Sequence, residues 1–132
     1  MARGEGLKAV ELKIQLIGIS ERDFSALKEM ALKADSRDLR VEGLRLLWNH
    51  GGSSMDTSGK YPEVYQEVFK ESAINDTDIG VRQSALELVR DPKFLETRML
   101  LDDSLLARAM AKSALEAVRR NPKGYVGPGW EY

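Results

Sequence analysis

Arginine and aspartate recur together along this chain at similar spacings. Within each couple the aspartate precedes the arginine by five or six residues. The couples are Asp35 with Arg40, Asp76 with Arg82, and Asp102 with Arg108. A guanidinium grips carboxylates and phosphates through paired hydrogen bonds, so one interpretation is a basic ridge for an acidic ligand. The other, which we favour, is that each arginine pairs with an aspartate in the turn of its own helix pair or of the adjacent one.

Few other residues are arranged as catalysis requires. His50 is the only histidine, and no serine, cysteine or second histidine accompanies it as a general base would need. Gly59-Lys60 faintly resembles a phosphate-binding loop, but Ser54 stands where that motif has glycine and Tyr61 where it has Ser or Thr. The absence of cysteine excludes disulfides and thiol chemistry. We therefore expect no catalytic residue, metal or cofactor, and a protein that is not an enzyme.

Aromatic side chains gather at two places that could contact a partner. Trp48 and Tyr61 flank a stretch rich in glycine and serine, where they form either core packing or an exposed recognition patch. Residues 125–132 form an aromatic C-terminal tail, expected to cap the last helices or to act as a short recognition motif.

The elements that must position these residues repeat along the chain. Helix ends are expected at Gly18, Asn49, Arg90 and Arg120, which gives steps of 31, 41 and 30 residues. Removing an insertion loop at residues 51–60 restores the period of 31. We interpret residues 1–124 as one repeat domain. Its inner helices are expected at residues 37–49, 78–90 and 105–120.

Apolar residues recur at helical spacing in each expected helix. Phe24, Leu27, Met30 and Ala31 share one face, and Val64, Val68 and Phe69 are expected to share another. The first segment alternates like a strand, but its place in the repeat favours a helix with two apolar faces. The second of these faces is a possible homodimer surface, formed by Leu12, Leu16 and Ile19.

The repeated pattern resembles the HEAT-like repeats also found in phycobilin lyases. Leu16-Ile17-Gly18 followed by an acidic turn matches its first half, and the run from Asp76 to Leu86, with Val81-Arg82 and Ala85-Leu86, matches its second half. The resemblance covers residues 7–120 and implies an all-α fold, an α-α superhelix of about three and a half helix pairs. The few repeats and the 51–60 insertion depart from the family pattern.

We expect a non-catalytic scaffold that binds another protein through the concave face of its inner helices. That face carries mixed charge, from Glu42, Arg45, Arg82 and Arg108. The alternative is an enzyme-associated chaperone or lyase-like protein, or a nucleic-acid-binding relative. A net charge of -1 makes nucleic acid an unlikely partner. No apolar run reaches the ~20 residues that span a bilayer, so no membrane association is expected, and a cytoplasmic location fits best.

Overall fold

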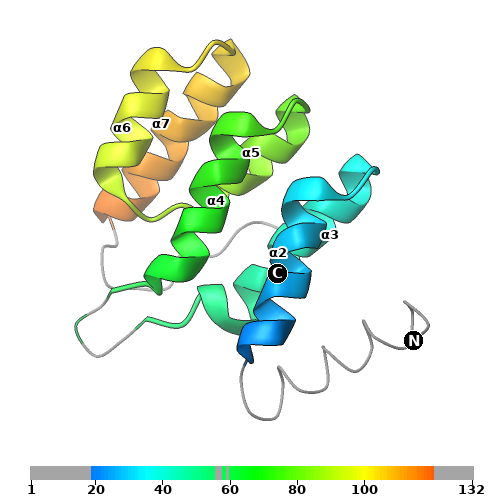
Figure 1. Cartoon of the computed structure of the whole chain (residues 1–132). Helices are drawn as coiled ribbons and strands as arrows, with labels where there is room; N and C mark the ends of the chain where they lie inside the picture. Colours follow the sequence, from blue (N-terminus) through cyan, green and yellow to red (C-terminus); the bar gives the residue numbers. More distant parts are fainter. Residues whose placement is uncertain (1–18, 56–57, 59, 121–132) are drawn as a thin grey trace.

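The computed structural model describes residues 19–55, 58 and 60–120, and this part of the chain is all-helical (Figure 1). Three helix pairs follow one another, each joined by a short turn, and no strand occurs in the described residues. The helices are α2 (Glu21–Lys33), α3 (Arg37–Leu47), α4 (Glu63–Asn75), α5 (Ile79–Leu88), α6 (Pro92–Leu101) and α7 (Leu105–Arg120). The predicted all-α class is therefore confirmed for these residues.

Short polar residues start most of the helices. Ser20, Ser36, Asp78 and Asp91 each accept hydrogen bonds from backbone N–H groups in the first turn of the helix that follows. Such a cap satisfies donors that have no partner inside the helix, and contributes about 1 kcal/mol. Ser104 accepts a similar bond from the N–H of Ala107 at the start of α7. The turns between the two helices of each pair are thus set by local sequence.

Each pair is held by its own apolar stripe and by the stripe of its neighbour. α2 packs on α3, α4 on α5 and α6 on α7, while α3 contacts α5 and α5 contacts α7. Figure 1 shows the α4–α5 pair lying between the other two. Trp48, directly after α3, and Phe69 of α4 are fully buried and contact each other where the first and second pairs meet. Because neither pair could bury these side chains alone, packing between pairs stabilises the array.

Gly43 permits a close contact between the two helices of the first pair. A Cβ atom at this position would lie 2.6 Å from the backbone nitrogen and 2.8 Å from the Cα of Ala31. Ala85 and Ala111 occupy the same position in the helices α5 and α7, and both are fully buried. Small residues at this position therefore let the two helices of a pair approach each other.

Two local features differ from the sequence prediction. The expected helix over 37–49 ends as an α-helix at Leu47, and a π-helical turn, η1 (Trp48–Gly52), follows it. In this turn the N–H of Ser53 donates to the carbonyl of Trp48, five residues earlier, at 3.0 Å. Val64 was expected on the apolar face of α4 but is 54% exposed, because Tyr65, Val68 and Phe69 form the face that enters the core.

Candidate functional site

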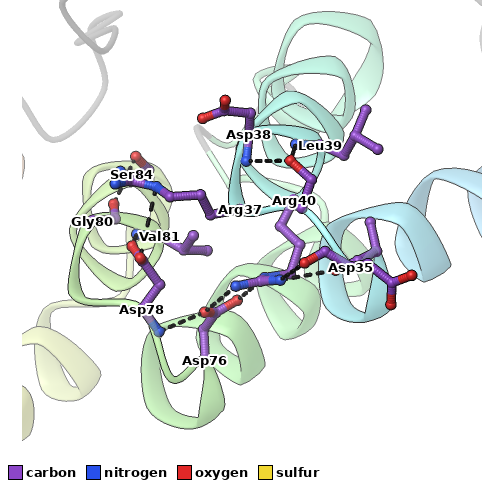
Figure 2. A network of polar contacts seen from close by, with 12 residues as sticks. Asp35, Arg37, Asp38, Leu39, Arg40, Asp76, Asp78, Gly80, Val81 and Ser84 are labelled. Atoms are coloured by element: carbon purple, nitrogen blue, oxygen red, sulfur yellow. Dashed lines mark hydrogen bonds and ion pairs between the residues drawn. The ribbon is translucent and has the colours of Figure 1, made fainter.

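The first arginine–aspartate contact links the first helix pair to the second. Nε of Arg40, on α3, donates to Oδ2 of Asp76 at 2.8 Å, and the Nη2 atom donates to Oδ1 at 3.3 Å (Figure 2). The remaining Nη1 donates to the carbonyls of Ala34 and Asp35 in its own turn, at 2.8 and 3.3 Å. One guanidinium therefore fastens two successive turns. Asp76 also accepts from the N–H of Asp78 at 2.9 Å, which orients its carboxylate.

A second contact runs beside the first one. Nε of Arg37 lies 3.6 Å from Oδ2 of Asp78, the residue that caps α5 (Figure 2). The neighbouring Gly80 leaves room for this guanidinium, since a Cβ there would lie 2.5 Å from Nη2 of Arg37. The turn between α4 and α5 is thus held from the first pair by two arginines.

The same relation recurs between the second and third pairs. Nη1 of Arg82, on α5, lies 3.1 Å from Asp103 and 3.9 Å from Asp102 in the α6–α7 turn. The hydrogen bond and positive charge of Arg82 lower the pKa of Asp103. Asp102 is buried, with Arg98 at 3.8 Å on its other side. In both turns an arginine reaches the aspartates of the adjacent pair.

These contacts decide between the two interpretations of the arginine–aspartate pattern for Arg40 and Arg82. Their guanidinium groups neutralise aspartates within the fold, so they do not form a ridge open to an acidic ligand. Arg108 occupies the same position in the last pair, four residues after the cap Ser104. Among the described residues no carboxylate pairs with Arg108, and its buried Nε has no acceptor.

The other two residues predicted for the concave face lie together on α3. Arg45 and Glu42 form an ion pair, with side chains 35% and 40% exposed. The hydrogen bond from Arg45 lowers the pKa of Glu42 more than burial raises it. Arg82 and Arg108 lie instead in the first turns of α5 and α7. The four predicted residues therefore lie in two places. Arg82 and Arg108 lie beside the interhelical turns, and Glu42 and Arg45 lie in the second half of α3.

Most of the aromatic cluster around Trp48 is buried inside the protein. Trp48 is fully buried, stacks on Tyr61 with ring centroids 5.8 Å apart, and contacts Phe69 at 6.3 Å. The guanidinium of Arg90 lies over the indole ring, 5.2 Å from its centroid. A buried ring offers no face to a partner, so only the half-buried Tyr61 of the predicted patch is accessible. Burial also raises the pKa of the nearby Tyr65 hydroxyl.

Sequence reasoning missed two polar residues of α4 that hold it to the end of α5 and to the start of α6. The buried Gln66 donates to the carbonyl of Leu88 at 2.9 Å and accepts from the N–H of Arg90 at 2.7 Å. Lys70 reaches Asp91, the cap of α6, at 2.8 Å. Gln66 stands among apolar neighbours on the buried face of α4, and that position was the available signal.

The remaining predicted residues contribute little to a site. Ile19 is half-buried against the core, and its companions Leu12 and Leu16 lie outside the described residues. His50 is half-buried in the π-helical turn. Within the described ranges no three His, Cys, Asp or Glu residues gather as metal ligands would. No helix in that part of the chain is long and apolar enough to cross a membrane.

Comparison with known proteins leaves the function open. No family model, curated protein or solved structure matches the chain.

Proposed function

We propose that the chain is a non-catalytic scaffold that binds another protein, built as a HEAT-like superhelix of helix pairs and working in the cytoplasm. The observation that carries the proposal is the repeated contact from an arginine of one pair to the aspartates of the next. It occurs as Arg40 with Asp76 and as Arg82 with Asp102 and Asp103. Equivalent contacts between successive units support a serial array, since each unit contacts mainly its neighbours.

The second half of α3 is the surface we assign to the partner. Glu42 and Arg45 expose both signs of charge on a helix that is anchored beneath by the fully buried Leu44, Leu46 and Leu47. A rigid backbone limits the conformational entropy lost on binding, so affinity comes from preorganised contacts. When the partner binds, Glu42 and Arg45 exchange their salt bridge for contacts with the partner. Such an exchange is expected of a polar and specific interface.

Affinity purification with the full chain as bait tests the proposal. The wild type, an Arg45→Glu variant and a Glu29→Lys variant are compared, since Glu29 is an exposed charge on α2. We expect a specific protein, identified by mass spectrometry, to be retained by the wild type and by Glu29→Lys. Reversing the charge at Arg45 should weaken its retention at least tenfold, about 1.4 kcal/mol.

Two outcomes would remove the proposal. One is a partner that Arg45→Glu and wild type retain equally, which would place binding elsewhere than on α3. The other is that no protein is enriched over a bait-free control. Circular dichroism of each variant confirms that the helices remain folded, so that a loss of retention reports the surface and not the fold.

A further inference from the structure

The outer side of α7 carries cations where the earlier pairs make internal contacts. Arg40, Arg82 and Arg108 each follow their helix cap by four residues, and the first two pair with aspartates of the next helix pair. Arg108 has the same position on the last described helix and no carboxylate partner among the described residues. A carboxylate from outside the described array would therefore complete the series.

Lys112 shows that this carboxylate is not supplied by a further helix pair of the same kind. The equivalent residues, four positions after the arginine, are Leu44 on α3 and Leu86 on α5, and both are fully buried. A pair stacked on α7 in the same way would bury the exposed Lys112 ammonium without water. Arg108 and Lys112 instead form two cations one helical turn apart, about 6 Å along the axis.

Exposed leucines lie on both sides of the turn that leads from α6 into α7. Their side chains are 60–75% exposed, which is unusual for four leucines on one short stretch of chain. They are Leu100, Leu101, Leu105 and Leu106, at the end of α6 and the start of α7. Together with Arg108 and Lys112 they form what we call the α7 patch, apolar at one end and basic at the other.

Helix α4 carries the complementary surface. Glu63, Glu67 and Glu71 are all exposed and follow one another at intervals of four residues, so they lie along one side of the helix. Val64 and Ile74, beside this row, are 54% and 45% exposed. The spacing of its carboxylates equals the spacing of the cations in the α7 patch. An acidic row with apolar residues beside it thus exists on the same molecule.

We propose that the α7 patch of one copy binds the acidic side of α4 of a second copy. Glu67 and Glu71 then supply carboxylates to Arg108 and Lys112, and the four leucines are covered together with Val64 or Ile74. The contact joins different surfaces of the two copies, so it closes as a dimer when both copies use it reciprocally. This assembly is separate from the α3 surface and does not depend on the proposed scaffold function.

Sedimentation velocity of the full chain, from micromolar to millimolar concentration, tests the proposal by charge reversal. The acidic-side variant is Glu67→Lys with Glu71→Lys, and the basic-side variant is Arg108→Glu with Lys112→Glu. Each variant alone opposes like charges, so we expect its dissociation constant to rise at least about tenfold over wild type. Mixing the two variants in equal amounts restores opposite charges at both contacts, and association should return.

The control reverses exposed charges elsewhere, with Lys28→Glu and Glu29→Lys on α2, and should associate like the wild type. Because Nε of Arg108 is buried, Lys112→Glu alone serves if the double variant does not fold. A wild type that stays monomeric at every concentration would overturn the proposal. So would unchanged association of both charge reversals, or a mixture that associates no better than its components.

Discussion

At the scale of single residues, the contact between Arg40 and Asp76 is a largely buried link between the first two helix pairs. The side chains are 15% and 5% exposed, so neither charge has much water around it. Removing the guanidinium leaves a buried carboxylate without its counter-charge. We expect Arg40→Leu to lower the free energy of unfolding by about 2–4 kcal/mol, measured by urea denaturation.

A surface ion pair provides the comparison for Arg40. Arg119 and Glu96 lie 3.2 Å apart, with side chains 59% and 54% exposed. Water solvates both charges when the pair is broken, so Arg119→Leu should change stability by less than about 0.5 kcal/mol. Equal effects of the two substitutions would show that burial does not determine the strength of these contacts.

The Lys70–Asp91 pair predicts a dependence on pH. Burial tends to raise the pKa of Asp91, but the Lys70 ammonium and the N–H groups of Phe94 and Lys93 outweigh it and lower that pKa. Because the unfolded chain then binds the proton more tightly, this stabilisation is present above the unfolded pKa of about 4 and is lost as the pH falls through the folded value.

Replacing Lys70 with methionine should therefore destabilise the protein at neutral pH and have less effect in acid. Urea denaturation of wild type and Lys70→Met at a series of pH values measures the difference. Lys93→Met, which removes an exposed ammonium from the first turn of α6, is the control and should show little difference at any pH. If the difference in free energy of unfolding between wild type and Lys70→Met stayed constant at pH values below the unfolded pKa of Asp91, the Lys70–Asp91 pair would not be its source.

At the scale of elements, close packing of α2 against α3 depends on Gly43. Alanine is normally the better helix former by about 1 kcal/mol, yet here its Cβ would collide with the backbone of Ala31. We expect Gly43→Ala to destabilise the protein by about 1–3 kcal/mol in thermal or urea unfolding. Gly80→Ala meets mainly the mobile end of the Arg37 side chain and should be close to neutral.

The helices themselves could be predicted from sequence, because their signals are local. Capping residues such as Ser36 and Asp78 and the apolar spacing around Leu27 and Leu44 indicate where helices begin and which side is buried. The π-helical turn could not be predicted, since it depends on Gly51 approaching Tyr65 of the next helix. A Cβ at Gly51 would lie 2.2 Å from the Tyr65 hydroxyl oxygen.

The polar contacts were harder to predict for the same reason. The spacing of Asp76 and Arg82 indicated an association but left open whether an arginine serves its own pair or the adjacent one. The answer depends on how two helix pairs are oriented, which no short sequence window contains. Trp48 illustrates this too: its position beside a loop allowed an exposed patch, and only tertiary packing on Phe69 and Tyr61 buries it.

At the scale of the whole molecule, we expect the three pairs to unfold together. Trp48 reports on the first and second pairs, because it contacts Phe69 of α4 and Arg90 beyond α5. In a Trp130→Phe background it is the only tryptophan. Its fluorescence and the far-ultraviolet circular dichroism should then give coincident urea transitions, as two-state unfolding requires. Separate midpoints would show that one pair unfolds independently.

Two of the arginine contacts with the interhelical turns, Arg40 with Asp76 and Arg82 with Asp103, respond differently to ionic strength. Asp76 is 5% exposed, whereas Asp103, the nearer acceptor of Arg82, is 84% exposed. Dissolved salt screens exposed charges far more than buried ones. Added salt therefore weakens the Arg82–Asp103 contact more than the Arg40–Asp76 contact, so the electrolyte around the protein adjusts one of the contacts that hold its last two helices.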